Sequence, residues 1–282
     1  MTQRMNKVVA KNNVAVITGA AKGIGAALAR ELHARGMKLA LLDSDAEGVS
    51  ALAAELGENV VPYQGDVTSE REFTAFRDAV IERFGSVHLL VNNVGATCHA
   101  GPWDALGTWR RAMAVNFESA LLAQHLFVPA MIAGSDAAAV VNLGSKEGIT
   151  TPPGNAGYST AKAALNAVTE QLAHELHQTT QGRVSAHLLV PGYTWTPMNF
   201  PGLDASIDAK PAAPWTAEQV VDYFLARLLN EDFYIICPDN EVSAELDAKR
   251  FRWSVEDMIQ NRPALSRWHP AWQARFADWL KS

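Results

Sequence analysis

A tyrosine and a lysine one helical turn apart are the strongest candidates for chemistry in this chain. Tyr158 and Lys162 stand in the segment Y-S-T-A-K, and a spacing of four residues puts both side chains on one face of a helix. A free tyrosine has a pKa of about 10, and a neighbouring ammonium group favours the phenolate and so lowers that pKa. The pair could thus act as a general acid and base, although the same spacing also arises in helices by chance.

Two further polar residues suit the same kind of site. Ser145 follows an apolar run over residues 138–143, and a hydroxyl there can donate to a substrate carbonyl oxygen as negative charge develops on it. Taken alone, Ser145 fits an ordinary turn equally well. Asn116 lies among apolar residues in a segment of helical period, where asparagine is unfavourable. Its amide therefore needs a partner, either a bound water or a backbone carbonyl.

A glycine-rich turn, T-G-A-A-K-G-I-G over residues 18–25, follows the first apolar run and opens a helix. Glycine lets the backbone turn tightly and approach a pyrophosphate closely, and the free N–H groups of a helix N-terminus attract negative charge. Close packing of the helix on the strand is the structural alternative. If the turn binds a dinucleotide, its contributing residues are Gly19, Lys22, Gly23, Ile24 and Gly25.

Two charged residues bear on the choice between NAD and NADP. Asp43 ends the second apolar run, where a carboxylate accepts hydrogen bonds from ribose hydroxyls and repels a 2′-phosphate. Lys22 could pair with a 2′-phosphate, or it could be a solvated lysine at the tip of the loop. We give Asp43 the greater weight, and so we predict NAD as the cofactor, with NADP less favoured.

Further cofactor contacts are expected after the next two apolar runs. Asp66 and Val67 follow the third run and are placed to meet an adenine ring, although Asp66 could equally cap a turn. Asn93 and Gly95 belong to N-N-V-G after the fourth run, where they could brace the loop against the cofactor. Each candidate lies at the carboxyl end of a successive predicted strand, where open α/β sheets bind their ligands.

The elements that must position these residues alternate regularly along the chain. Short apolar runs between longer segments of helical period indicate a parallel sheet with helices on both faces, a doubly wound α/β domain of the Rossmann type with about seven strands. The predicted strands are residues 14–18, 38–43, 60–64, 87–92, 138–143, 184–190 and 233–238. The predicted helices are residues 24–35, 46–56, 69–84, 108–131, 159–177 and 217–229.

The chain is expected to form a single domain, over residues 13–239, with an extension at each end. Residues 1–12 are polar and are expected to form a flexible leader. Residues 198–215 hold three prolines and a glycine without a clear period, so we predict an excursion loop that reaches the substrate.

Residues 240–282 form a C-terminal extension rich in tryptophan, in which residues 254–260 and 271–280 have helical period. Its tryptophans could pack on their own subunit, form a subunit interface, or close over a neighbouring active site. They are Trp253, Trp268, Trp272 and Trp279.

The composition excludes several other classes of protein. With 48% hydrophobic and 19% charged residues and a net charge of −6, the chain is of ordinary globular type, and it has no basic block that would bind nucleic acid or an anionic membrane. It contains neither an apolar run long enough to span a membrane nor a secretory signal. Two cysteines, Cys98 and Cys237, are too few for a disulfide framework or a zinc site. We therefore expect a cytoplasmic protein with a small-molecule substrate and no metal.

Taken together, these motifs resemble the short-chain dehydrogenase/reductase family in identity, order and spacing from residue 13 to about residue 198. The matching patterns are T-G-x-x-x-G-I-G, the acidic end of the second strand, D-V, N-N-x-G, the helical asparagine, the serine, Y-x-x-x-K and P-G-x-x-x-T over residues 191–196. No single pattern is decisive, but their joint occurrence is highly specific.

The resemblance implies a role for each residue of the set. Tyr158 would exchange a proton with the substrate oxygen while a hydride passes to or from the nicotinamide, and Lys162 would lower the Tyr158 pKa and hold the nicotinamide ribose. Ser145 would orient the substrate oxygen, and Asn116 would anchor a water of the proton relay. The resemblance also assigns cofactor contacts to Asn93, Pro191, Thr194 and Thr196.

The chain departs from the family in two places. The family more commonly has N-N-A-G where this chain has N-N-V-G, and the change from alanine to valine adds little bulk. The last predicted strand lacks the glycine-rich ending that the family commonly packs into a tetramer interface. A homodimer or a homotetramer is expected, and the Trp-rich extension puts the usual tetramer in doubt.

The substrate is less well defined by the sequence than the reaction. Apolar and aromatic residues are expected around the nicotinamide, with no arginine among them, which favours a secondary alcohol or ketone of modest size over a dicarboxylate or a phosphorylated substrate. Lys146, directly after Ser145, could still bind an anion. The residues expected there are Ala96, Cys98, His99, residues 147–156, Tyr193, Trp195 and the loop over residues 198–215.

Three functions compete for this sequence. An NAD-dependent alcohol dehydrogenase or carbonyl reductase fits the complete proton-relay set best, with an NADP-preferring reductase as a variant. A catalytically inactive protein that senses or binds NAD(P) has no need for that set. A sugar-nucleotide epimerase or dehydratase is disfavoured by the glycine spacing and by the short C-terminal region.

Overall fold

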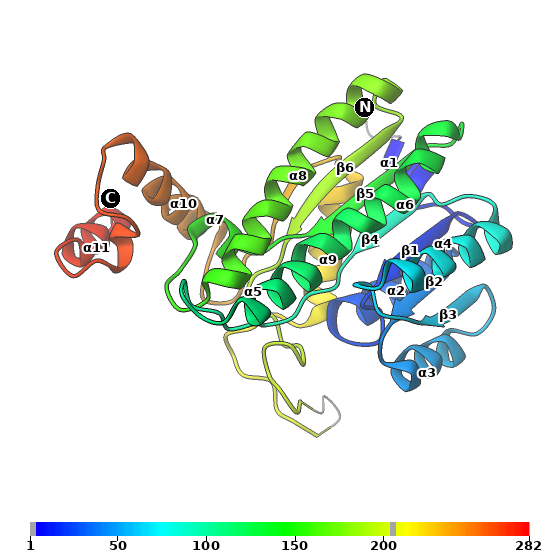
Figure 1. The fold of residues 1–282 in the computed structure, drawn as a ribbon, viewed down its shortest axis with the longest axis horizontal. Coiled ribbons are helices and arrows are strands. Elements are labelled where there is room, and N and C mark those ends of the chain that lie inside the picture. The colour runs from blue at the N-terminus through cyan, green and yellow to red at the C-terminus, as the bar shows by residue number, and fades with distance from the viewer. Residues whose placement is uncertain (1–3, 204–206, 282) are drawn as a thin grey trace.

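The computed structural model describes residues 4–203 and 207–281, which contain one parallel seven-stranded sheet with the order β3-β2-β1-β4-β5-β6-β7 (Figure 1). The strand order reverses direction between β1 and β4, as it does in doubly wound sheets of the Rossmann type. The strands are β1 (Val14–Thr18), β2 (Lys38–Asp43), β3 (Val60–Gln64), β4 (Leu89–Asn92), β5 (Ala138–Leu143), β6 (Val184–Val190) and β7 (Tyr234–Ile236). This confirms the predicted fold class.

Helices cover both faces of the sheet and form two apolar cores. One face is covered by α2 (Gly23–Ala34), α3 (Ala46–Leu56) and α9 (Ala217–Leu229), and the other by α4 (Glu70–Phe84), α6 (Ser119–Ala133) and α8 (Ala156–Thr180). Because the central strands are buried on both faces, β1, β4 and β5 consist entirely of buried residues. This is the physical origin of the uninterrupted apolar runs.

The expected leader is partly ordered, which corrects the prediction of a flexible segment. Residues Arg4–Val8 form a short helix, α1, and the side chains of Met5 and Val8 are fully buried against the core. Arg4 forms an ion pair with Glu231 at 2.9 Å and donates a hydrogen bond to the Gly182 carbonyl. Five residues are too few to show a helical period in a polar segment. Residues 1–3 of the predicted leader lie outside the described residues.

The predicted long helix over residues 108–131 is three consecutive elements. An α-helix, α5 (Leu106–Met113), continues into a π-helical turn, η1 (Ala114–Glu118), and then into α6. A π-helical turn inserts one extra residue without breaking the helix, and such turns are frequent at functional sites. The described parts of the predicted excursion loop, residues 198–203 and 207–215, contain neither a helix nor a named strand.

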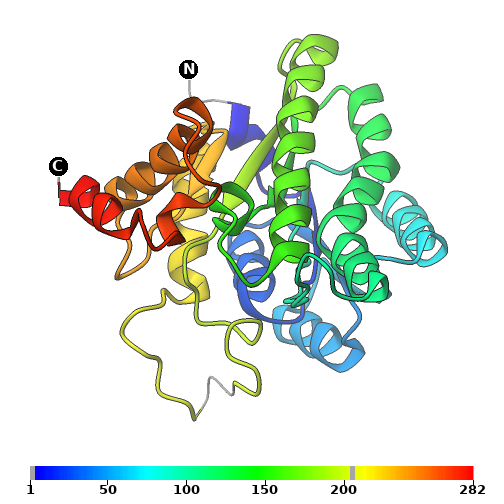
Figure 2. The ribbon, with the colours of Figure 1, turned by 60° about the vertical axis from the view of Figure 1, so that its left-hand side comes forward.

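The C-terminal extension is a small helical unit beside the sheet domain, in which α10 (Ala244–Ile259) and α11 (Gln273–Lys281) project away from the sheet (Figures 1 and 2). Trp253, only 4% exposed, packs against Trp272, Phe276 and Trp279 with ring centroids 5.2–6.4 Å apart. Its indole nitrogen donates to the Ser266 hydroxyl at 2.7 Å. These tryptophans therefore pack within their own subunit, and α10 begins ten residues earlier than predicted.

Candidate active site

A cavity of about 980 Å³ opens at the carboxyl ends of the strands and brings most of the predicted residues together. Two predicted residues, Gly25 and Asn116, lie behind its wall rather than on it. The predicted residues on the wall are Gly19, Lys22, Gly23, Ile24, Asp43, Asp66, Val67, Asn93, Gly95, Ser145, Tyr158, Lys162, Pro191, Thr194 and Thr196. The strand ends thus converge on one site, as a doubly wound sheet requires.

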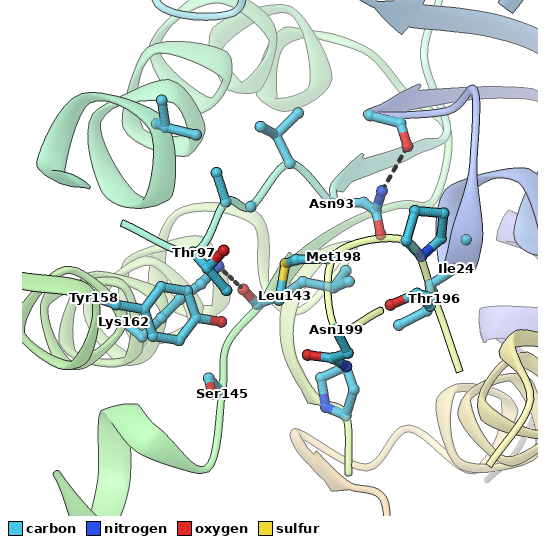
Figure 3. A pocket seen from close by; sticks show the side chains of 18 of the residues that line it. Ile24, Asn93, Thr97, Leu143, Ser145, Tyr158, Lys162, Thr196, Met198 and Asn199 are labelled. Atoms are coloured by element: carbon cyan, nitrogen blue, oxygen red, sulfur yellow. Dashed lines mark hydrogen bonds between the residues drawn. The ribbon is translucent and has the colours of Figure 1, made fainter. Parts of the chain in front are cut away.

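Tyr158 and Lys162 come from the first two turns of α8 and lie next to Ser145, which follows β5 (Figure 3). Both side chains are almost completely buried, with 6% and 2% of their surface exposed. The Lys162 ammonium lies 5.8 Å from the centroid of the Tyr158 ring and donates to the Leu143 carbonyl at 2.8 Å. The three chemically competent groups therefore meet on one part of the cavity wall.

Burial shifts the pKa values of this pair in opposite directions. It raises the pKa of Tyr158 to about 12, and a hydrogen bond with Ser145 offsets only part of that rise. It lowers the pKa of Lys162 to about 8. The pKa of Tyr158 therefore lies above its ordinary value rather than below it, because desolvation of the phenolate and the nearby charge of Glu147 together outweigh the hydrogen bond with Ser145.

The Asn116 amide is hydrogen-bonded to the backbone. A backbone carbonyl was one of the two partners predicted for it, the other being a bound water. In η1, its amide oxygen accepts from the Ala96 N–H at 2.9 Å, and its amide nitrogen donates to the carbonyls of Ala112 and Ala96 at 3.0 and 3.1 Å. These bonds fix the loop that follows β4. Gly95 lies beside both residues, since a Cβ atom at that position would be in ordinary contact with the Asn116 amide oxygen at 3.5 Å and with the Lys162 ammonium at 3.7 Å.

The glycine-rich turn is held so closely that a methyl group would not fit inside it. A Cβ atom on Gly25 would lie 2.2 Å from the Gly19 carbonyl oxygen. The Asn93 amide donates to that same oxygen at 2.8 Å and to the Thr18 carbonyl at 3.1 Å. Gly19 and Gly23 have φ values of +65° and +56°, which favour glycine. The cradle leaves free N–H groups at the N-terminus of α2 and fits the pyrophosphate of a dinucleotide.

The acidic residues beside this turn are held by backbone hydrogen bonds. The Asp43 carboxylate accepts from the Ala21 and Asp45 N–H groups, each at 2.9 Å. Lys22, predicted as a potential partner of a 2′-phosphate, instead pairs with Asp45 at 2.6 Å, and this contact raises its pKa. Asp66 accepts from the Thr68 N–H and hydroxyl at 2.9 and 2.8 Å, so it stabilises a turn while also lining the cavity.

The segment over residues 191–196 closes the cavity on the side of β6. The Thr194 hydroxyl donates to the Gly192 carbonyl at 2.9 Å, and the Thr196 side chain lies 3.2 Å from the position of a Cβ atom on Gly23. Thr194 and Thr196 are buried, 1% and 8% exposed. This segment therefore contacts the glycine-rich turn from the opposite side of the cavity.

Several lining residues differ from the sequence-based expectation of an apolar pocket. Arg110 and Arg111 line the cavity from α5, where no arginine was expected. They stand six and five residues before Asn116, a spacing that does not place them on its helical face, so no pattern in the sequence pointed to them. Lys146, considered as an anion-binding residue, is engaged by Asp247 at 2.5 Å and by Asp239 at 3.7 Å.

The described residues contain no group of three histidine, cysteine or carboxylate side chains that could hold a metal ion. Within the same ranges, no helix is both long enough and apolar enough to cross a membrane.

Comparison with known proteins assigns the chain to a family. The model of the short chain dehydrogenase family matches residues 13–203, so the chain belongs to the short-chain dehydrogenase/reductase family. A solved short chain dehydrogenase/reductase from Burkholderia phymatum, in complex with NAD, is similar with a TM-score of 0.79 and 28% identity, over 89% of this chain and 96% of that one.

Two curated relatives are similar over about two thirds of the chain. The CLA biosynthesis dehydrogenase/reductase of Lactiplantibacillus plantarum is 30% identical over 190 residues, which are 66% of this chain and 66% of that protein. The galactitol 2-dehydrogenase (L-tagatose-forming) of Cereibacter sphaeroides is 37% identical over 191 residues, which are 66% of this chain and 73% of that protein. The family match ends at residue 203, before the C-terminal extension.

Proposed function

We propose that this protein is an NAD-dependent dehydrogenase or reductase that interconverts a secondary alcohol and a ketone. The observation that carries the proposal is the convergence of the buried Tyr158 and Lys162 with Ser145 on the cavity wall, at the end of a dinucleotide cradle. The NAD complex of the Burkholderia phymatum protein and the reaction named for the galactitol dehydrogenase support the cofactor and the substrate class. Asp43 at the end of β2 supports NAD over NADP.

Each residue then has a defined task. A bound nicotinamide cofactor supplies or accepts the hydride. The Tyr158 phenol, protonated at neutral pH because its pKa is about 12, donates its proton to the ketone oxygen, and its phenolate takes the proton back in the oxidation direction. The Ser145 hydroxyl positions the same oxygen, and the Lys162 ammonium, held by the Leu143 carbonyl, stabilises the phenolate.

Replacing Tyr158 by phenylalanine tests this assignment. We expect Tyr158→Phe to lose about 100-fold or more of the turnover, because general acid and base catalysis typically contributes 10²–10⁴-fold. NADH affinity should stay within about twofold, because the hydroxyl is a small part of the cofactor cradle. Turnover is measured by NADH absorbance with a panel of secondary alcohols and ketones, and affinity by NADH fluorescence.

The same measurement separates catalysis from cofactor sensing. A sensing protein would bind NADH but turn over no member of the panel, and Tyr158→Phe would then change nothing. Undiminished turnover in Tyr158→Phe would refute the mechanism.

A further inference from the structure

A carboxylate lies in the cavity next to the residues proposed to handle the substrate oxygen. Glu147 begins the short helix α7 (Glu147–Thr150), two residues after Ser145, and its own N–H donates to the Ser145 hydroxyl oxygen at 3.1 Å. It lines the cavity together with Ser145 and Tyr158. Its charge is close enough to Tyr158 to contribute to the raised pKa of that phenol. Glu147 therefore belongs to the substrate end of the cavity.

The Glu147 carboxylate is only weakly compensated by its neighbours. One carboxylate oxygen accepts from the Asn155 amide at 3.4 Å and from the Ser159 hydroxyl at 3.5 Å, both at the long limit of hydrogen bonding. Lys146, its neighbour in sequence, is engaged by Asp247. Among the described residues, Glu147 forms no ion pair within 4.0 Å. Burial raises its pKa, while a favourable interaction with His99 acts in the opposite direction.

A second acceptor lies beside it. The amide oxygen of Asn155, also on the cavity wall, is buried and has no hydrogen-bond partner within the described residues. Buried acceptors without partners are costly in proteins. The Glu147 carboxylate and the Asn155 amide oxygen can therefore both accept further hydrogen bonds on the same wall. This indicates that a molecule bound there would supply hydrogen-bond donors rather than acceptors.

We infer that Glu147 determines specificity, and that the site takes a substrate with a hydrogen-bond donor, a hydroxyl or an ammonium group, on the carbon next to the reacting one. The inference rests on the proposed function, because it places the reacting carbon between Ser145 and Tyr158. A donor one carbon away then reaches the neighbouring carboxylate.

The wall is consequently polar where the sequence suggested aromatic and apolar residues. The substrate classes that fit are vicinal diols with their hydroxyketones, and 2-amino alcohols with their aminoketones. A site built to bind a donor group discriminates strongly against the analogue that lacks it, because its own acceptor is then left unpaired.

The test compares substrates matched in size. Oxidation of 2,3-butanediol, 3-amino-2-butanol and 2-butanol, and reduction of acetoin and butanone, are measured with the wild-type protein and with Glu147→Gln. A hydrogen bond to a charged group contributes about 1.5–3 kcal/mol, so we expect kcat/KM for a donor-bearing compound to exceed that for its plain analogue by at least about tenfold. In Glu147→Gln that ratio should fall about tenfold, chiefly through KM.

The two donor-bearing alcohols identify the donor. Glu147→Gln removes a charge, and this loss weakens the binding of an ammonium group more than that of a hydroxyl. If the kcat/KM ratio falls more for the amino alcohol than for the diol, the donor is an ammonium group. If the ratio falls equally for both, the donor is a hydroxyl. Glu82→Gln is the matched control, because Glu82 is an exposed glutamate on α4, away from the cavity. This control should keep the wild-type ratio.

Binding without turnover provides an independent measurement. In the Tyr158→Phe background with NADH, calorimetry should show acetoin binding more tightly than butanone, and the added Glu147→Gln change should remove that difference. A wild-type preference for the plain analogues, or a ratio unaffected by Glu147→Gln, overturns the inference while the proposed function stands. Binding of NADH without turnover of any compound overturns the proposed function and the inference with it.

Discussion

Lys162 is buried at a cost to the stability of the fold. Its pKa of about 8 lies below the ordinary value of 10.5, so between these two pH values the folded protein binds fewer protons than the unfolded chain. Stability therefore rises with pH across that window, and the full cost is present below pH 8. The shift corresponds to about 3 kcal/mol at neutral pH. The Lys162 ammonium also donates to the Leu143 carbonyl, a hydrogen bond of about 1 kcal/mol that an apolar replacement would lose.

We expect Lys162→Met to be inactive and, at pH 7, about 2 kcal/mol more stable than the wild type. The gain should shrink as the pH rises from 8 to 10.5, because the wild-type lysine becomes neutral in both states. Denaturant unfolding at pH 7, 9 and 10.5 measures it. Tyr158→Phe is the control. Because the Tyr158 pKa is about 12, ionisation of this tyrosine affects the free energy of unfolding only at pH values above about 10. A gain independent of pH would show that the lysine charge is not its source.

We expect the cofactor preference to depend on two neighbouring carboxylates with different tasks. Asp43 faces the cavity while bracing the turn through two backbone hydrogen bonds, and Asp45 holds Lys22. Asp43→Asn removes the charge but keeps one acceptor oxygen. We expect this change to lower the ratio of kcat/KM for NAD to that for NADP by about tenfold.

Asp45→Asn is the matched variant for this prediction. It leaves Asp43 in place but releases Lys22 toward a 2′-phosphate, so it should lower the ratio less, and the double variant should lower it most. Initial rates with both cofactors decide the outcome. A ratio that Asp43→Asn leaves unchanged would remove Asp43 from the discrimination.

At the scale of single residues, the sequence correctly predicted the cavity-lining residues that belong to a recognisable motif. Tyr158, Lys162, Ser145 and Asp43 all reach the cavity wall as predicted. The sequence could not show which charged residues of a loop are paired, since Lys146 and Glu147 both line the cavity, yet within the described residues Lys146 forms ion pairs and Glu147 forms none. Burial, which sets the Tyr158 pKa, was likewise invisible until the packing was known.

At the scale of elements, the contact between the glycine-rich turn and α2 allows a direct test. Gly25→Ala would place a methyl group 2.2 Å from the Gly19 carbonyl oxygen, so the turn has to shift. We expect this variant to bind NADH at least about tenfold more weakly and to be less stable by about 2 kcal/mol or more. Fluorescence titration and denaturant unfolding measure the two effects.

Gly107→Ala is the control, because Gly107 also lies in a helix and a methyl group there meets nothing within 4 Å. It should gain a few tenths of a kcal/mol from reduced backbone entropy and leave NADH affinity unchanged. Wild-type affinity in Gly25→Ala would contradict the close packing of the turn.

Five of the seven predicted strands have the observed bounds, and burial does not decide which, because the half-exposed edge strand β3 is among them and the fully buried β4 is not. β1, β2, β3, β5 and β6 have the predicted bounds, whereas β4 and β7 are shorter at their ends. The sequence pattern of the predicted helix over residues 108–131 did not reveal the π-helical turn within it, because one inserted residue barely alters the spacing of apolar residues. Hydrogen bonds of Asn116 to Ala96 and Ala112, rather than a pattern of residue types, mark that turn.

At the scale of the whole molecule, the extension is tied to the active site through a buried ion pair. Asp247 on α10 and Lys146 beside Ser145 lie 2.5 Å apart, and their side chains are 3% and 19% exposed. Asp239 binds both Lys146, at 3.7 Å, and the Tyr193 N–H, at 3.1 Å. The extension thus contacts the loop that positions Ser145 in its own subunit, whereas the sequence had connected the extension only with a neighbouring active site.

Deleting residues 244–282 removes Asp247 and leaves the Lys146 charge without its main partner. Truncating one side of a buried ion pair typically costs 3–5 kcal/mol, and α7 also loses its contact with α10. We expect the shortened protein to be less soluble, or to differ in subunit number from the homo-oligomer that we propose for the full chain, and to have at least about tenfold lower turnover. Size-exclusion chromatography with light scattering and the NADH assay measure these effects.

A paired variant separates the loss of the ion pair from the loss of the extension. Lys146→Met with Asp247→Leu keeps the extension and replaces the ion pair by apolar contact, which is often neutral or stabilising. This double variant should retain the full-length subunit number and fold stability, whereas Asp247→Asn alone should be destabilised by about 2 kcal/mol. If the shortened protein keeps the subunit number, solubility and turnover of the full chain, the extension is dispensable and its contact with Lys146 serves neither assembly nor catalysis.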